Sequence, residues 1–369
     1  MITWRDGEVV SLGASWAGAQ ELTVRTADGV VRALAYPAVV GDVAPGDRVL
    51  LNVTALARGL GTGGYALVVA RPDALPPDPP SGPGHLVKGR YTPQQAMVLG
   101  VDEQESEHHG LLRDADDLGG LPVVVADLHS ALPAVVAGAR WSAAAAGRPH
   151  PRVAYVMTDG GALPAWFSRT VATLRDAGWL ASCLTVGQAF GGDLEAVTVH
   201  TGLLAARLVA GADLAVVAQG PGNLGTGTRW GFSGVAVGEA LNAAAVLRGR
   251  PVAALRVSGA DPRERHRGIS HHSRTAVGRV ALAPADVVVP VGDAAEDRAA
   301  LRALVHEQAR ALCRPTGRHT LVEIAVERGL EEALTHTPVR LSTMGRGLDA
   351  DPEAFVAAAV AGVHAERSR

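Results

Sequence analysis

A glycine-rich polar segment, Gln219–Gly234, has the clearest potential for chemistry in this sequence. It follows the apolar run Ala212–Ala218 and precedes the helical pattern Val235–Leu247. A strand, a glycine-rich loop and a helix can form an anion site, because backbone N–H groups and a helix N-terminus converge there. Strand-to-helix connections usually span about 2–6 residues, and longer ones tend to be functional or disordered, which favours a ligand site. The alternative is a long loop kept soluble by glycine and threonine. The ligand contacts predicted in this segment are Gln219, Gly220, Gly222, Asn223, Gly225, Thr226 and Thr228.

The same segment contains a G-x-G-x-x-G match at Gly220–Gly225. In a dinucleotide-binding unit the helix begins at the glycines, and an acidic residue ends the next strand. Here the helical pattern begins only at Val235, and the next apolar run ends in Arg256-Val257-Ser258, with no acidic residue. The match therefore does not predict NAD binding.

A second segment, Asp261–Thr275, contains three histidines and four arginines. Histidine suits general acid–base catalysis near neutral pH, and the arginine fork suits phosphate or carboxylate. The alternative is a solvated charged loop. The histidine spacing is not a standard zinc spacing, so we predict no metal, and the sequence identifies no cofactor. The predicted catalytic residues are His266, His271 and His272, and the predicted ligand contacts are Arg263, Ser270 and Arg274.

These histidines are expected on a polar loop that contributes little to the core. Replacing His271 and His272 by glutamine should then cost little stability, because surface substitutions usually change the free energy of unfolding by less than about 0.5 kcal/mol. A buried histidine would predict a larger loss.

Asp159 follows the apolar run Arg152–Met157, where a catalytic or ligand-positioning carboxylate would lie. We predict that it acts near the histidines and that Thr158 and Gln188 contact the ligand. The alternative for Asp159 is a helix N-cap, since aspartate is a favourable capping residue.

From residue 85 onward, apolar runs alternate with helical stretches, which predicts a mostly parallel, doubly wound (Rossmann-like) α/β sheet. The runs are Pro122–Ala126, Arg152–Met157, Leu180–Val186, Asp213–Ala218, Val252–Val257, Asp286–Val291 and Thr320–Val326. The helical stretches include Ala131–Ala146, Phe167–Ala177, Leu194–Val209, Ala294–Leu312 and a C-terminal helix capped by Asp351. Ligands bind beyond the carboxyl ends of parallel strands, so we expect the polar loops to converge at that edge.

Residues 1–72 contain short apolar runs separated by turn signals, which predicts a small all-β barrel or sandwich domain. Residues 73–84 form a proline-rich linker. Residues 85–369 are predicted to be the Rossmann-like α/β domain.

Composition excludes several classes of protein. The net charge of −3 gives no reason to expect nucleic-acid binding. No apolar run approaches the roughly 20 residues of a membrane span, so we expect no membrane association and a cytoplasmic protein. Lys88 is the only lysine and is followed by Gly89, which excludes a P-loop and leaves Lys88 as the only residue that could form an imine.

Several motifs together resemble an uncharacterised bacterial family, mainly from high-GC Gram-positive bacteria, that is catalogued only as a domain of unknown function. They include Lys88–Pro93, Met157–Gly160, Gly187–Asp193, Gln219–Asn223, Gly268–His272 and Ser342–Arg346. One departure is Gly89, where the family pattern leads us to expect a bulkier residue. The resemblance implies no reaction, substrate or catalytic residue.

We therefore predict an enzyme that acts on a small anionic metabolite, phosphorylated or nucleotide-like. The alternative is a non-catalytic regulatory protein that senses a nucleotide or metabolite in the same pocket, while its β-barrel contacts a partner. The sequence leaves the oligomeric state open, a homo-oligomer included.

Overall fold

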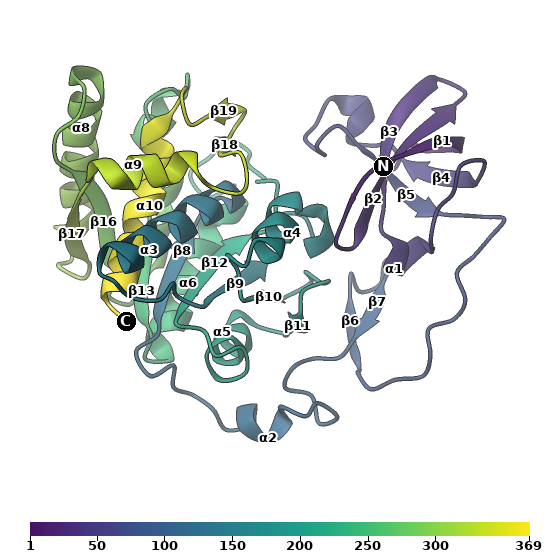
Figure 1. The fold of residues 1–369 in the computed structure, drawn as a ribbon, viewed down its shortest axis with the longest axis horizontal. Coiled ribbons are helices and arrows are strands. Elements are labelled where there is room, and N and C mark those ends of the chain that lie inside the picture. The colour runs from purple at the N-terminus through teal and green to yellow at the C-terminus, as the bar shows by residue number, and fades with distance from the viewer.

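The computed structural model describes residues 1–369, which form a β-barrel beside a larger α/β unit (Figure 1). The barrel closes in the order β1-β2-β3-β5-β4, which confirms the predicted all-β architecture of the N-terminal region. Its strands are β1 (Trp4–Trp16), β2 (Ala19–Thr26), β3 (Gly29–Ala35), β4 (Arg48–Asn52) and β5 (Ala66–Ala70). The short helices α1 (Pro37–Val40) and η1 (Leu56–Arg58) connect them.

The barrel has its own core. Val24, Ala33 and Leu51 of its strands are fully buried in a cluster separate from the rest of the molecule. The proline-rich segment that follows forms no helix or strand. After it come the hairpin β6 (Leu86–Lys88) and β7 (Ala96–Val98) and the short helix α2 (His109–Leu112). The exact domain limits at residues 72 and 85 stay a prediction.

The second unit is built on an eight-stranded parallel sheet in the order β11-β10-β9-β12-β8-β13-β16-β17. This confirms the α/β prediction, and the apolar runs form its strands because parallel strands are buried on both faces. The strands are β8 (Pro122–Ala126), β9 (Val153–Thr158), β10 (Ser182–Thr185), β11 (Leu194–Glu195), β12 (Leu214–Gln219), β13 (Arg250–Ala254), β16 (Asp286–Val291) and β17 (Thr320–Ala325).

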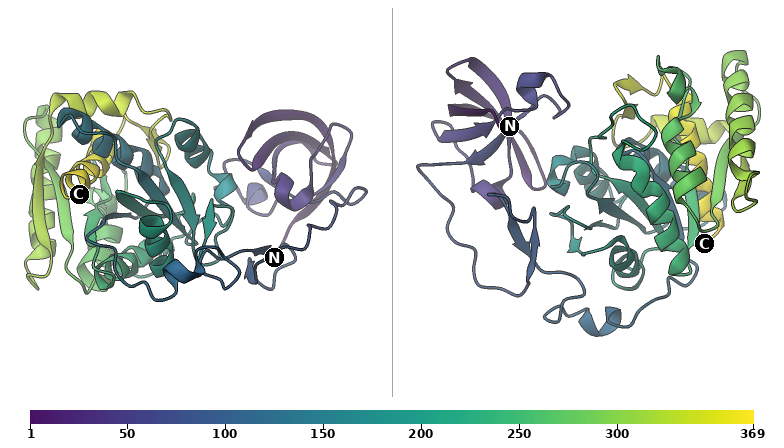
Figure 2. Two further views of the ribbon diagram at one scale, coloured as in Figure 1. Left: turned by 60° about the horizontal axis from the view of Figure 1, so that its bottom comes forward. Right: turned by 180° about the vertical axis from the view of Figure 1, so that it is seen from behind.

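Helices cover both faces of this sheet (Figures 1 and 2). One face carries α3 (Leu132–Ala145), α4 (Arg169–Asp176), α9 (Arg328–Thr335) and α10 (Pro352–Arg367). The other carries α5 (Val199–Leu208), α6 (Ala236–Val246), α7 (His271–Thr275), η6 (Ala276–Val280) and α8 (Glu296–Cys313). None of the helices is long and apolar enough to cross a membrane.

Small residues allow two helices of the first face to approach closely. A β-carbon at Gly138 of α3 would lie 2.0 Å from the carbonyl oxygen of Ala359 in α10. A β-carbon at Gly362 of α10 would lie 1.9 Å from the carbonyl oxygen of Val135. Only glycine permits this crossing, which holds the C-terminal helix against the sheet.

One helix prediction was wrong at its start. The predicted helix Leu194–Val209 begins only at Val199, because Thr198 caps it by accepting a hydrogen bond from Thr201 N at 3.2 Å. The residues before the cap form β11 instead. There the Glu195 carboxylate accepts hydrogen bonds from the Thr185 hydroxyl at 2.7 Å and from Gly191 N at 2.6 Å.

The strand order places β8 at a topological switch. The connections after β8 and β9 run toward the β11 end of the sheet, whereas those after β12 and β13 run toward the β17 end. Right-handed crossovers therefore carry them to opposite faces and leave a crevice at the carboxyl end of β8. The residue at that position is Asp127.

Candidate functional site

Three neighbouring strands bring Asp127, Gln219 and Arg256 together at the switch. The Gln219 Nε2 group donates a hydrogen bond to the backbone carbonyl of Asp127 at 3.0 Å. Arg256 Nη1 lies 3.4 Å from Asp127 Oδ2, and both side chains are largely buried. This polar triad lies where an open parallel sheet normally binds ligands.

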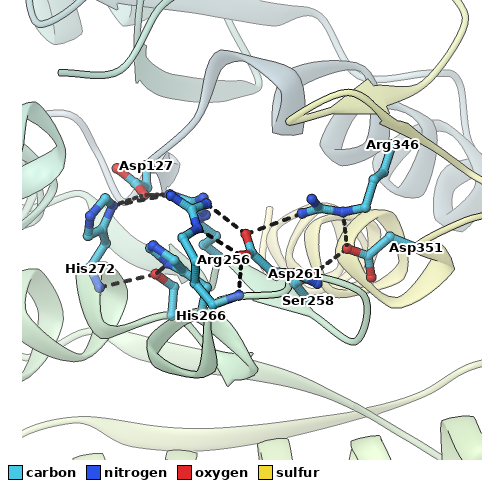
Figure 3. A network of polar contacts seen from close by, with 10 residues as sticks. Asp127, Arg256, Ser258, Asp261, His266, His272, Arg346 and Asp351 are labelled. Atoms are coloured by element: carbon cyan, nitrogen blue, oxygen red, sulfur yellow. Dashed lines mark hydrogen bonds and ion pairs between the residues drawn. The ribbon is translucent and has the colours of Figure 1, made fainter. Parts of the chain in front are cut away.

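The triad is extended by His272, whose Nδ1 lies 3.2 Å from Asp127 Oδ2 and 3.1 Å from Arg256 Nη1 (Figure 3). Carboxylate oxygen only accepts and guanidinium only donates, so Nδ1 bonds with one of them according to its tautomer. With a proton on Nδ1 the ring donates to Asp127, and its Nε2 lone pair is left for a ligand. Phe232 stacks on the same ring, with centroids 3.9 Å apart and an interplanar angle of 4°.

His266 and His271 complete a cluster of three imidazoles. The ring centroids of the cluster lie 4.4 to 5.1 Å apart. His266 Nδ1 contacts the Ser270 hydroxyl at 2.7 Å, and the same hydroxyl accepts a hydrogen bond from His272 N as the N-cap of α7. His271 Nε2 is buried and has no hydrogen-bond partner.

The expectation of a polar loop with little core burial is wrong for two of these histidines. His266 is 2% and His272 is 8% exposed. The segment folds back through the small hairpin β14 (Val257–Ser258) and β15 (Gly268–Ile269), which carries it beneath the rim of the sheet. Replacing His272 would therefore disturb packing against Phe232 as well as any chemistry.

The environment keeps two of the imidazoles neutral. Burial, followed by the nearby Arg256 guanidinium, lowers the pKa of His266 to about 3. Burial, followed by the neighbouring His272, lowers the pKa of His271 to about 4. At neutral pH both rings keep a lone pair that can accept a hydrogen bond or bind a ligand.

A cleft of about 630 Å³ opens beside this cluster. We call it the arginine cleft, because its lining includes Arg229, Arg274 and Arg279 together with His271 and Gln308, and no carboxylate. Its wall includes η6, a π-helical turn in which Ala281 N donates to Ala276 O at 2.9 Å. Single π turns occur often at functional sites.

The predicted partner Arg263 does not share this cleft. Its guanidinium bonds instead to both carboxylate oxygens of Asp261, at 2.9 and 2.8 Å. Arg346 contacts Asp261 Oδ2 at 3.4 Å and Asp351 Oδ2 at 3.2 Å (Figure 3). Asp351 occupies the N-cap position of α10 as predicted, but its side chain makes no capping bond and accepts from Gly259 N at 2.9 Å.

The glycine-rich segment forms a hairpin-like loop that bonds largely to itself. Thr226 N donates to Gly231 O at 2.7 Å, and Thr228 Oγ1 accepts from Gly231 N at 3.1 Å. Asn223 Oδ1 accepts from the Ser233 hydroxyl at 2.8 Å. The predicted ligand side chains Asn223 and Thr228 thus form hydrogen bonds within the loop. Phe232, near the end of the loop, stacks on His272.

The remaining predicted residues lie on the other side of Gln219. Asp159 Oδ2 accepts a hydrogen bond from Gln188 N at 2.8 Å, and Gln188 Oε1 accepts from Arg90 N at 3.1 Å. The Thr158 carbonyl accepts from Gly220 N at 3.1 Å. The Asp159 carboxylate therefore bonds to the Gln188 loop and not to a histidine. The carboxylate that contacts His272 is Asp127.

Lys88 is buried on the same side. Its ammonium donates to the carbonyls of Gly187, Ala189 and Ala196 at 2.7, 3.1 and 2.8 Å. Burial lowers the pKa of Lys88, and the neighbouring Glu195 carboxylate opposes that shift. With all three N–H groups used, Lys88 anchors the β6–β7 hairpin to the sheet rather than offering an amine for an imine.

Two buried acceptors at the switch lack partners, Asp127 Oδ1 and Gln219 Oε1. Both residues line a cavity of about 10 Å³ that also contains Gly234. A β-carbon at Gly234 would lie 1.7 Å from Asp127 Oδ1, so only glycine fits there. A cavity of this size suits about one water, which could donate to both oxygens.

The sequence prediction missed Arg229, Arg256 and Arg279 as site residues. Arg256 could have been found, because it follows the apolar run of β13 as Asp159 follows that of β9. Arg229 and Arg279 carry no comparable signal. They belong to different segments that only the fold brings to one cleft.

Comparison with known proteins gives one match. A family model described as "Protein of unknown function (DUF3866)" matches residues 32–362, which is most of the chain and confirms the resemblance noted from the motifs. No curated protein and no solved structure matches the chain.

Proposed function

We propose that this chain, which belongs to the DUF3866 family, is an enzyme that binds and acts on a small anionic metabolite in the arginine cleft. The ligand class is phosphorylated or nucleotide-like, because guanidinium forks match phosphate oxygens in geometry and charge.

The observation that carries the proposal is the charge of the cleft. Arg229, Arg274 and Arg279 line it, and no carboxylate lines it to neutralise them. Two other arginines of this rim have acidic partners, Arg263 with Asp261 and Arg256 with Asp127. Three arginines that share one concavity without an acid would gain most from an anionic ligand.

His271 supplies the chemistry in this proposal. It lines the cleft, its Nε2 is buried without a partner, and its ring is neutral at physiological pH. The negative charge of a bound anion would raise the pKa of this imidazole, which could then take a proton from a hydroxyl or water. Asp127 and His272 form a carboxylate–imidazole pair next to it, which would orient the cluster.

The alternative, a non-catalytic regulatory protein, is supported by the barrel. The barrel contacts the α/β unit at Trp166, whose carbonyl accepts a hydrogen bond from Trp16 Nε1 at 2.7 Å. The barrel stands beside the α/β unit, and part of it faces away from that unit, where a partner could bind (Figure 2). In that case the cleft would bind the anion without converting it.

The test is a thermal-shift screen of phosphate esters, nucleotides, pyrophosphate and dicarboxylates, since a bound ligand raises the melting temperature by mass action. Titration calorimetry then compares the best anion on the wild type and on Arg274→Gln and Arg279→Gln. We expect each substitution to weaken binding about tenfold to a hundredfold, because a charge-assisted hydrogen bond contributes roughly 1.5–3 kcal/mol.

Arg340→Gln is the matched control, because Arg340 is exposed and lies outside the cleft. Equal affinity in all four proteins would overturn the anion site. Conversion of the ligand, followed by mass spectrometry, separates the enzyme from the sensor: an anion that binds in the cleft and returns unchanged supports the regulatory alternative.

A further inference from the structure

We propose that His266, His271 and His272 bind one divalent transition-metal ion of the zinc type at the inner end of the arginine cleft. The spacing in the sequence argued against a metal, but the fold brings the three rings to one point. The inference does not depend on which anion the cleft binds, but in the metal-bound chain His271 would be a ligand of the ion instead of the proton acceptor proposed above.

The distances support a three-histidine site. One ring nitrogen of each histidine lies within 4.8 Å of those of the other two. Zinc–nitrogen bonds of about 2.0–2.1 Å place the ligand nitrogens of a tetrahedral site roughly 3.4 Å apart. Closing the widest separation requires about 1.4 Å, which small side-chain rotations can supply.

The hydrogen bonds leave one ring nitrogen of each histidine for the ion when His272 Nδ1 donates to Asp127 rather than accepting from Arg256. Nδ1 of His266 is occupied by Ser270 Oγ at 2.7 Å, and Nδ1 of His272 contacts Asp127 Oδ2 at 3.2 Å. Metal-binding histidines commonly donate their other N–H to a carboxylate or similar acceptor, which fixes the tautomer. His271 Nε2 is buried without a partner, and a metal ion would satisfy it.

The charges around the three histidines are mixed. Asp127 balances Arg256 and Asp261 balances Arg263. Arg274 also lies near His271 and no acid lines the cleft, so an anion bound beside the ion would favour its binding. Three neutral imidazoles would leave the ion its full charge and an open coordination position. Since His271 also lines the arginine cleft, an oxygen of a bound phosphate or a water could take that position.

An acid–base cluster without metal is the competing interpretation, and it needs only one exposed imidazole. It does not explain why His266 and His272 are buried with their Nδ1 atoms engaged and the unpartnered Nε2 of His271 close by. The convergence of three imidazoles is the feature that favours the ion.

The experiment uses the full chain, stripped with a chelator and dialysed, and titrated with Zn²⁺ alone and with Co²⁺ alone in the absence of any anion. We expect one ion per chain and a visible Co²⁺ spectrum of a four- or five-coordinate site. His271→Ala should weaken Zn²⁺ binding more than a hundredfold, while His200→Ala, at an exposed helical histidine, should leave it unchanged.

His271 is only half-buried, so His271→Ala is expected to fold, and circular dichroism checks this. Asp127→Asn is the second variant and should weaken binding about tenfold to a hundredfold, as loss of an outer-shell partner does. Absence of stoichiometric binding, or binding that His271→Ala leaves intact, overturns the metal site. If the metal-free protein still binds the anion, the anion site is supported even when the metal site is not. The two proposals can therefore fail separately.

Discussion

The rim of the sheet has two sides that meet at Gln219, and they differ in how completely their polar groups are bonded. On the side of β9 and β10, Asp159, Lys88 and Glu195 all have partners within the protein. On the side of β13 and α7, His271 Nε2 has none, and the arginines of the cleft face no acid. We call these the bonded side and the open side.

The difference separates scaffold from site. A buried polar group without a partner costs about 1–3 kcal/mol, so a fold keeps such groups only where something else compensates, such as a ligand. Asp159, Lys88 and Glu195 on the bonded side need no ligand to complete their hydrogen bonds. The sequence predicted site residues on both sides of Gln219. Only the hydrogen-bond partners in the structure distinguish the two sides.

Lys88→Met should give the largest effect and would test the bonded side. Methionine is similar in length to lysine but leaves three carbonyls without the ammonium donor and the Glu195 carboxylate without its countercharge. We expect the free energy of unfolding to fall by about 3–5 kcal/mol, as when one partner of a buried ion pair is removed. Urea denaturation measures it, and a loss below about 1 kcal/mol would contradict the scaffold role.

Acid should destabilise the bonded side through His129, the next largest effect. Burial lowers the pKa of His129 to about 4, while its backbone contact with Gln219 opposes the shift. Its ring nitrogens contact Tyr155 Oη at 2.9 Å and Ser168 Oγ at 2.7 Å.

The unfolded chain binds the His129 proton near pH 6.5, whereas the folded chain binds it only near pH 4. The contribution of neutral His129 to the free energy of unfolding is therefore fully present above pH 6.5. It is lost as the pH falls toward 4, by up to about 3 kcal/mol. Comparing the pH dependence of unfolding in the wild type and His129→Gln isolates this group. Identical slopes between pH 6.5 and 4 would refute it.

Asp159→Ala should have a smaller effect and sharpens the boundary between the two sides. Its carboxylate accepts one backbone hydrogen bond, from Gln188 N, so we expect a loss of about 1 kcal/mol. Affinity for the anion should be unchanged, as measured by calorimetry. If affinity falls at least tenfold while the protein stays folded, Asp159 belongs to the site as the sequence predicted.

Cleavage of the proline-rich segment should have the smallest effect. The barrel packs at Trp166 on the bonded side, where a β-carbon at Gly18 would lie 2.1 Å from the indole ring. We expect limited proteolysis to cut within Arg71–Gly84 and to leave anion affinity unchanged. Preferential cuts inside Leu180–Val257 would argue against this division into domains.

The architecture was predictable because buried parallel strands are continuous apolar runs. Pro122–Ala126 and Asp286–Val291 were predicted with the bounds that β8 and β16 have. β11 was missed because a strand of two residues is too short to show an alternating pattern. Its position in the sheet depends on the hydrogen bonds of Glu195, which the sequence does not reveal.

The site was less predictable because it depends on partners. Polar residue types gave no warning that His266 is buried, since its burial follows from Ser270 and the hairpin β14–β15. Likewise Arg279 lies five residues beyond Arg274, a spacing that no helical pattern assigns to one face.

That spacing gives the π turn a mechanical consequence. Residues five apart in an α-helix are offset by about 140° around the axis, so Arg274 and Arg279 would diverge. The wider i→i+5 winding of Ala276–Val280 brings them over the same cleft. If this turn adopted α-helical winding, Arg279 would point away from the cleft. The affinity for an anion would then fall without any change of sequence. A bound anion that holds both guanidinium groups would in turn stabilise the wider coil, so the pitch of one helical turn and the occupancy of the cleft are thermodynamically linked.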